Sequence, residues 1–212
     1  MTLANDYSGQ RERSVTVYCW SRTEPKTKKW DEAESLGYLL ASSGFTVITG
    51  GYCGSMEAVS KGARRAVDAL KQSTAAGTTQ VPEVVGILVP GQFPDRVLSG
   101  NQYLTTEVHA RSMTERLDML SSRSRYYIAL PGTLGTLQEL TLVWGLGAFH
   151  VAGRPRPLVI CWRDPWETLV KAVESILHLP KEIVAALHYV DTPDEAMTLI
   201  LKDSERASPT TT

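Results

Sequence analysis

Residues 126–139 read YYIALPGTLGTLQE, and this stretch decides the fold. It begins with a continuously apolar run, Tyr126 to Leu130, of the kind that forms a strand buried on both faces. Pro131 and Gly132 break the run, and a helical pattern begins at Gly135. A buried strand that leads through a glycine turn into a helix is the repeating unit of an α/β sheet. The whole chain is therefore expected to alternate strands and helices.

The same strand, turn and helix order recurs on both sides of this stretch. Expected strands cover residues 15–20, 45–49, 84–89, 126–130 and 158–162, with a short extended piece at 103–106. Expected helices cover residues 30–40, 55–70, 109–122 and 135–149, and two more begin at 164–165 and at 192. Because the strands are apolar without alternation, we expect an α/β, Rossmann-like, doubly wound fold. Its sheet should be mostly parallel, with helices on both faces.

The 212-residue chain is expected to form one domain, residues 14–203, between polar tails at 1–13 and 204–212. Its hydrophobic fraction of 42% is sufficient for a sizeable core. The formal net charge is -1 and the basic residues are scattered, whereas binding to a nucleic-acid backbone needs a basic surface. The sequence therefore predicts no nucleic-acid partner.

The location of the protein is inferred from its cysteines and its apolar segments. The N-terminal tail lacks the apolar core of a secretory signal, and no later stretch is long enough to span a bilayer. No membrane partner is expected. Cys19, Cys53 and Cys161 show no C-x-x-C spacing, which fits free thiols in a reducing compartment. A cytoplasmic location follows as an expectation.

Two glycine turns open helices at strand ends, which is where α/β sheets bind their ligands. The N–H groups of such a turn, together with the positive end of the helix dipole, suit a phosphate. Either turn alone is explained by tight chain reversal, but two at equivalent places favour a phosphate or nucleotide site. The candidate residues are Gly132, Thr133, Gly135 and Thr136 in one turn, and Gly51, Gly54, Ser55 and Met56 in the other.

Two charged side chains are candidates for chemistry at this site. Glu139 lies one turn into its helix and off the apolar stripe. It either interacts with the helix dipole or lies beside a bound phosphate sugar. Arg116 lies at the edge of the preceding helix's apolar stripe, where it either binds an anion at the rim or pairs with a surface acid. Ser21 and Met113 are further candidates for the lining of the pocket.

Motifs of other enzyme classes are missing from the sequence. There is no G-x-x-x-x-G-K-[ST] loop and no G-x-S-x-G elbow, and the nearest G-x-G-x-x-G, at 145–150, follows a helix. The four histidines are isolated, so no metal site is expected. Lys61 is the only lysine near the predicted crevice and lies well inside a helix, which argues against pyridoxal chemistry. Cys53 is interpreted as a small turn residue. No cofactor is expected.

Three segments together resemble the Lonely Guy family of cytokinin-activating phosphoribohydrolases, which are also labelled possible lysine decarboxylases, and related molybdenum-cofactor carrier proteins. The family motif P-G-G-x-G-T-x-x-E is similar to residues 131–139, and its M-H-x-R-K segment is similar in part to residues 113–117. Residues 50–59 resemble the family's second-strand glycine turn and helix. The resemblance runs from the first strand through Trp144.

The resemblance implies hydrolysis of the bond between a base and ribose 5'-monophosphate. It places Glu139 and Arg116 at catalytic positions, and it implies a homodimer or higher oligomer. This chain departs from the family at four positions: Thr133 replaces a glycine, Thr114 a histidine, Leu117 a lysine and Trp20 a small residue. The retained Glu139 and Arg116 favour a phosphoribohydrolase acting on an adenine or cytokinin nucleotide. The replaced residues favour a non-catalytic carrier of a phosphate-bearing ligand such as molybdopterin, and both hypotheses remain open.

Overall fold

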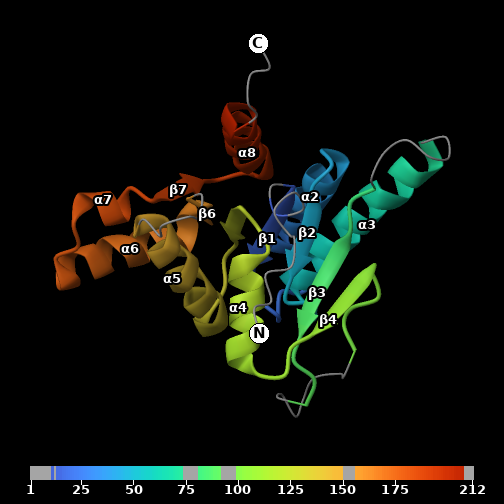
Figure 1. The fold of residues 1–212 in the computed structure, drawn as a ribbon, viewed down its shortest axis with the longest axis horizontal. Helices are drawn as coiled ribbons and strands as arrows, with labels where there is room; N and C mark the ends of the chain where they lie inside the picture. The colour runs from blue at the N-terminus through green and yellow to red at the C-terminus, as the bar shows by residue number, and fades with distance from the viewer. Residues whose placement is uncertain (1–10, 12, 74–80, 92–98, 150–155, 208–212) are drawn as a thin grey trace, which may run out of the picture.

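The computed structural model describes residues 11, 13–73, 81–91, 99–149 and 156–207. Expectations for residues 1–10, 74–80, 150 and 208–212 lie outside these ranges. Seven strands form one sheet in the order β4-β3-β2-β1-β5-β6-β7, and each pair of neighbours is parallel (Figure 1). The strands are β1 (Ser14–Tyr18), β2 (Thr46–Thr49), β3 (Val84–Leu88), β4 (Thr106–His109), β5 (Tyr126–Ala129), β6 (Leu158–Trp162) and β7 (Leu187–Val190). The predicted α/β class is confirmed.

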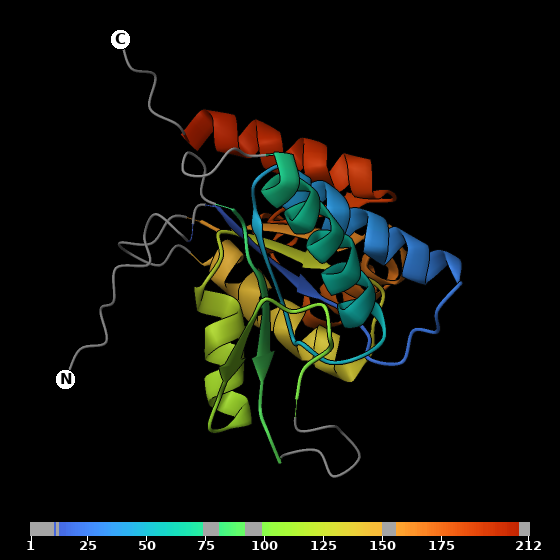
Figure 2. The same cartoon turned by 90° about the vertical axis from the view of Figure 1, so that its right-hand side faces the viewer.

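Helices cover both faces of this sheet, as a doubly wound fold requires. Figure 2 shows α2, α3 and α8 on one face and α4 and α5 on the other. The helices are α2 (Lys28–Ser42), α3 (Ser55–Ser73), α4 (Met113–Ser122), α5 (Leu134–Ala148), α6 (Arg163–Leu177), α7 (Lys181–Val184) and α8 (Pro193–Ala207). Within the described ranges, no helix combines the length and the apolar character needed to cross a membrane.

Several element boundaries differ from the prediction. The extended piece expected at 103–106 is β4 at 106–109, so α4 begins at Met113 instead of near 109. Ser112 ends the intervening turn because its side chain accepts a hydrogen bond from the Glu115 N–H at 3.1 Å and caps the helix. Strand β7 and helix α7 were not predicted, since four residues are too few for a periodic signal. Helix α8 continues to Ala207, four residues past the expected end of the domain.

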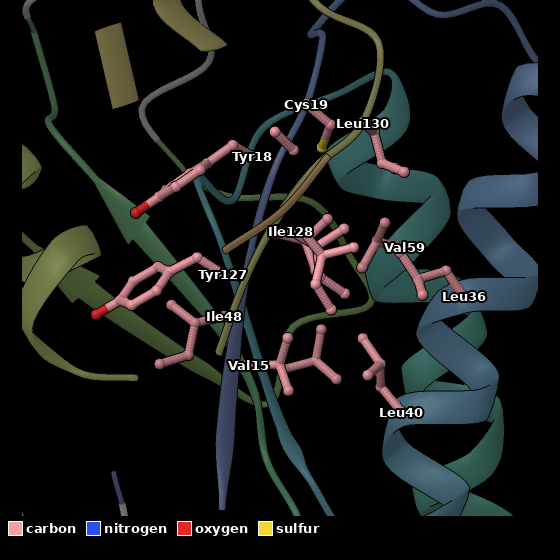
Figure 3. Close-up of a cluster of buried hydrophobic side chains, with 14 of the residues drawn as sticks. Val15, Tyr18, Cys19, Leu36, Leu40, Ile48, Val59, Tyr127, Ile128 and Leu130 are labelled. Atoms are coloured by element: carbon pink, nitrogen blue, oxygen red, sulfur yellow. The ribbon is translucent and has the colours of Figure 1, made fainter. Parts of the chain in front are cut away.

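The core lies on both sides of the central strands β1 and β5. In Figure 3 the rings of Tyr18 and Tyr127 extend to one side, and Val15 and Ile128 face helices α2 and α3 on the other. The two rings stack with their centroids 6.0 Å apart. Tyr18 Oη donates to the Leu120 carbonyl at 3.1 Å, so a buried hydroxyl is satisfied by helix α4. These contacts fix α4 against the sheet, beside the ends of the strands.

Helices α2 and α3 pack closely because each carries a glycine at the crossing. A Cβ atom at Gly62 of α3 would overlap the backbone oxygen of Glu34, and one at Gly37 of α2 would overlap that of Val59. These backbone atoms are held in helices and cannot shift away from an added Cβ atom as the end of a flexible side chain could. The close approach therefore depends on these two residues having no side chain.

Replacing Gly62 with alanine is expected to lower the free energy of unfolding by about 2–3 kcal/mol, as overpacking of a close contact does. Gly145→Ala is the matched control, because a Cβ there would meet atoms no closer than 3.9 Å. That change should stabilise α5 by about 0.5–1 kcal/mol through helix propensity. Equilibrium urea unfolding of both variants measures the difference. Equal stability of Gly62→Ala and the unaltered protein would contradict this account of the crossing.

Candidate functional site

A cavity of about 290 Å³ opens at the carboxyl ends of β1, β2 and β5. The strand order explains its place, because β1 lies between β2 and β5 and the chain leaves β1 and β5 toward opposite faces. The lining residues come from three strand ends and from helices α3, α4 and α5. They are Val17, Cys19, Trp20, Ser21, Gly50, Met56, Met113, Arg116, Leu117, Thr133, Leu134, Gly135, Thr136, Gln138 and Glu139.

The N-terminus of α5 forms one wall of the cavity. Thr133 is the N-cap residue and has an extended backbone with φ -118°, so its side chain causes no strain where the family motif has glycine. A Cβ atom at Gly132 would overlap the side chain of Thr136, which explains why glycine is needed there. Gly135 has no atom within 4 Å of the position that its Cβ would take. This wall is therefore accessible from the cavity and presents hydroxyl groups and the N–H groups of the helix start.

Arg116 lies deeper than the sequence predicts. Its side chain is only 7% exposed, whereas we expected the guanidinium to reach the rim. Nε donates to the Ile87 carbonyl at 2.9 Å and Nη2 to the Gly50 carbonyl at 3.3 Å. The guanidinium also lies over the ring of Tyr52, 5.8 Å from its centroid. Strand ends β2 and β3 thus hold the arginine by contacts that are distant in sequence.

Arg116 and Glu139 form a partly buried ion pair at the cavity. Arg116 Nη1 lies 3.3 Å from Glu139 Oε1, and the glutamate side chain is 12% exposed. Gly50 must be glycine for this arrangement, because a Cβ there would overlap Arg116 Nη2. Helices α4 and α5 therefore bring together the two charged residues that the sequence singled out. Arg116 therefore pairs with a partly buried glutamate and not with a surface acid.

The second glycine turn lies beside the cavity and supports the end of β1. Gly51 and Gly54 have positive φ angles of 76° and 68°, which glycine adopts without strain. The Ser55 N–H donates to the Trp20 carbonyl at 2.8 Å, and the Gly51 N–H donates to Thr49 Oγ1 at 3.1 Å. These amides are engaged within the chain. Of this turn and the start of its helix, Gly50 and Met56 line the cavity, whereas the proposed phosphate ligands Gly51, Gly54 and Ser55 do not.

The remaining candidates divide clearly. Ser21, Met113, Thr133, Gly135 and Thr136 line the cavity, while Gly132 lies just behind Thr136. Sequence reasoning missed Val17, Cys19, Gly50, Leu134 and Gln138 as lining residues, and it noted Trp20 and Leu117 only as departures from a family pattern. The available signal was position, since Cys19 and Trp20 follow directly on β1. Among the described residues, no three His, Cys, Asp or Glu side chains gather into a metal site.

Cys19 lies in the cavity as a neutral thiol. Burial raises its pKa well above the usual value, and the negative charge of Glu139 raises the pKa further. Burial likewise raises the pKa of Cys161 to about 12. Cys53, in contrast, is exposed on the glycine turn. Because the thiolate is the nucleophile, the two buried cysteines should be inert.

Iodoacetamide at about pH 8 is therefore expected to modify Cys53 alone in the folded protein. A raised pKa keeps Cys19 and Cys161 protonated at that pH, and Cys161 is in addition fully buried. Peptide mass spectrometry identifies the labelled residue, and all three cysteines should react in denaturant. A Cys53→Ser variant is the control and should remain unlabelled when folded. Labelling of Cys19 at the rate of Cys53 would contradict the burial described above.

Comparisons with known proteins agree with this architecture. The family model described as possible lysine decarboxylase matches residues 56–200. A cytokinin riboside 5'-monophosphate phosphoribohydrolase of Mycobacterium marinum is 30% identical over 168 residues, covering 78% of this chain and 77% of that protein. The Mycobacterium tuberculosis protein of the same name is 29% identical over 154 residues, which cover 72% of this chain and 71% of that protein. The molybdenum cofactor carrier protein of Chlamydomonas reinhardtii superposes with a TM-score of 0.63 over 92% of this chain and 99% of that one. At 19% identity that likeness concerns the fold.

Proposed function

Since the chain belongs to the family described as possible lysine decarboxylase, in which its curated relatives are named phosphoribohydrolases, we propose that it is a phosphoribohydrolase itself. The substrate is a nucleoside 5'-monophosphate of adenine or cytokinin type, and the products are the free base and ribose 5-phosphate. The observation that carries this proposal is the Arg116–Glu139 pair at a cavity whose wall is the N-terminus of α5.

The wall of α5 suits the 5'-phosphate. Helix N–H groups carry a partial positive charge and point out of the helix end, where an anion is stabilised. Thr133 and Thr136 line the cavity beside these groups and add hydroxyl donors. There is no acidic residue in the first turn of α5 to repel the phosphate. We therefore assign the phosphate to this turn, because the Gly51 and Ser55 amides of the second glycine turn bond within the chain and neither residue lines the cavity.

Glu139 is suited to the bond-breaking step. The bond between C1' of the ribose and a ring nitrogen of the base breaks with its electron pair going to the base, which takes up a proton from the surrounding water. The ribose then carries positive charge at C1', and a nearby carboxylate stabilises that charge. The same carboxylate can accept a proton from the water whose oxygen bonds to C1'. Both roles need a fixed carboxylate, and Arg116 fixes it.

The guanidinium of Arg116 has N–H groups that can donate to the ligand. A guanidinium carries five N–H groups, and three of them donate to Ile87, Gly50 and Glu139 in the described chain. The other two are available to an oxygen atom of the ribose or of the phosphate. Because the arginine is held on both sides by backbone carbonyls, it offers these groups in a defined direction.

A homodimer in the cytoplasm is part of the proposal. Helix α5 exposes the large apolar side chains of Leu134 at 79% and Leu142 at 39%, and its C-cap residue Phe149 is 62% exposed. Leu134 also lines the cavity. A second copy of the chain on this helix would remove apolar surface from water and close one side of the site. Sedimentation analysis is expected to give the mass of a dimer, and a monomer at micromolar concentration would contradict this part.

A non-catalytic carrier is the second candidate, and Leu117 is the observation that favours it. This leucine lines the cavity where the family motif has lysine, so the site has one cation fewer. The superposition on a protein named molybdenum cofactor carrier fits such a role. A carrier would bind a phosphate-bearing ligand without breaking it.

Incubation with AMP and with N6-isopentenyl-AMP distinguishes the two candidates. The hydrolase proposal predicts that adenine or the isopentenyl base and ribose 5-phosphate appear in equal amounts over many turnovers, measured by liquid chromatography and mass spectrometry. Binding of either nucleotide without release of base would support the carrier. The Glu139→Gln variant serves as the control for contaminating nucleosidases.

A further inference from the structure

We propose that Trp20 determines specificity by stacking on the base of the nucleotide, an inference that rests on the proposed function. The side chain follows β1 and lines the cavity together with Met113, Leu117 and Leu134. These four residues contribute apolar side chains to the lining, whereas Arg116, Glu139, Thr133 and Thr136 contribute charged and hydroxyl groups. A nucleotide divides in the same way, into a flat apolar base and a charged sugar phosphate.

The place of β1 in the sheet puts Trp20 between the two glycine turns. Strand β2 lies on one side of β1 and β5 on the other, and each ends in a glycine turn. Tyr18 pairs with Ala129, and the Leu130 N–H donates to the Tyr18 carbonyl at 2.9 Å. Trp20 thus lies two residues after Tyr18, the last residue of β1 that pairs with β5. Strand β5 leads directly to the N-terminus of α5, where the phosphate is proposed to bind. A ligand held at that wall lies within reach of the indole.

The second glycine turn gives the tryptophan a fixed backbone. The Ser55 N–H donates to the Trp20 carbonyl, and Ser55 Oγ lies 2.6 Å from Thr23 Oγ1. A Cβ at Gly54 would lie 2.6 Å from the Trp20 carbonyl oxygen, so only glycine allows this approach. The turn thereby orients the loop that carries Trp20 and does not need to touch the ligand. This explains why the Ser55 amide, in a turn that resembles a phosphate loop, bonds to the neighbouring loop.

The side chain of Trp20 is partly exposed, in contrast to the other tryptophans for which a side-chain bond is described. Trp144 Nε1 and Trp166 Nε1 donate to the carbonyls of Ile183 and Leu130 at 2.7 and 3.0 Å. Within the described part of the chain, no acceptor bonds to Trp20 Nε1. An aromatic ring at a cavity with its N–H unused offers a base both a stacking face and a donor.

The test compares binding of formycin 5'-monophosphate with binding of ribose 5-phosphate by calorimetry. Formycin monophosphate resembles AMP, but its base is joined by a carbon–carbon bond that hydrolysis cannot break, so turnover does not affect the result. Trp20→Ala is expected to weaken its binding between about fivefold and a hundredfold, as removal of an aromatic ring beneath a base does. Ribose 5-phosphate should bind within about twofold of its affinity for the unaltered protein, because the phosphate wall is intact.

Matched variants keep the test decisive. Trp20→Phe retains a ring and should keep most of the affinity for formycin monophosphate, and Glu24→Ala alters an exposed residue of the same loop without effect. Unchanged binding of formycin monophosphate to Trp20→Ala, or an equal loss for both ligands, would overturn the stacking role. Release of adenine from AMP is measured separately. If Trp20→Ala weakens binding of formycin monophosphate alone but the unaltered protein releases no adenine, the stacking role is retained and the hydrolase proposal is rejected. If the unaltered protein releases adenine but Trp20→Ala binds formycin monophosphate normally, the hydrolase proposal is retained and the stacking role is rejected.

Discussion

Replacing Glu139 with glutamine is expected to lower kcat for release of the base about a thousandfold, the effect typical of losing a catalytic carboxylate. Glutamine has the same size and can still accept the hydrogen bond that Arg116 Nη1 gives to Oε1 at 3.3 Å. It has neither the negative charge that stabilises C1' nor the basicity that activates water. The Michaelis constant should therefore change little while kcat falls, and the free energy of unfolding should fall as well, because the buried Arg116 loses the charge of its partner.

Glu115→Gln is the matched control for this prediction. Glu115 is also a glutamate paired with an arginine, Arg111, at 2.8 Å, but it lies at the exposed start of α4 and outside the cavity. Its replacement should leave kcat within about twofold of the unaltered enzyme, as for surface changes in general. Steady-state release of adenine from AMP measures both variants. If Glu139→Gln releases base as fast as the unaltered protein, the mechanism proposed above is wrong even if the reaction itself occurs.

The fold could be predicted from the sequence where apolar runs and glycine turns agree. Strands such as Tyr126 to Leu130 are buried on both faces, and their continuous apolar character distinguishes them from the amphipathic helices around them. The prediction was wrong where segments are short. The β4 edge strand alternates between partly buried and exposed residues, and β7 includes an exposed histidine, so neither gives a continuous apolar signal. Their place depends on pairing with β3 and β6, which the sequence does not encode locally.

The charged pair of the site could be predicted in part. Arg116 and Glu139 stood out because each is a charged residue near an apolar stripe, but their contact is a tertiary one between α4 and α5. The depth of Arg116 could not be foreseen, since it is set by carbonyls of Ile87 and Gly50 that are 29 and 66 residues away in the chain. The apolar periodicity of a helix predicts which way a side chain points, but it does not predict which groups the side chain contacts in the folded protein.

The second glycine turn shows a different limit of sequence reasoning. Its glycines were interpreted as phosphate ligands because a glycine turn at a helix start offers free amides. The sequence cannot tell whether those amides point to a ligand or to another loop. Here the Ser55 amide bonds to Trp20, and Gly54 is needed for the close approach of the two loops. The glycines therefore indicated an unusual backbone conformation in this turn. Which groups the turn contacts depends on the loop that follows the neighbouring strand β1.

Arg116→Met is expected to lower the free energy of unfolding by about 3–5 kcal/mol, because it breaks a buried ion pair on one side only. The arginine is 7% exposed, and its removal leaves the Glu139 carboxylate without its cation. The carbonyls of Ile87 and Gly50 also lose their donors. Methionine fills most of the volume, so the loss reports electrostatics and hydrogen bonds more than a cavity. Arg116→Lys should be intermediate, since one ammonium cannot reach three acceptors in the geometry of a guanidinium.

The double variant Arg116→Met with Glu139→Gln separates the two parts of this loss. If the unpaired carboxylate accounts for most of the cost, neutralising it should restore about 1–3 kcal/mol relative to Arg116→Met alone, as coupled residues do in such cycles. Base release should stay as low as in Glu139→Gln, because restored stability brings back no catalytic charge. Urea unfolding and adenine release measured on the same four proteins give both quantities. A double variant no more stable than Arg116→Met would mean that the backbone carbonyls, and not Glu139, are what Arg116 stabilises, and its assigned role in fixing the catalytic carboxylate would then fail.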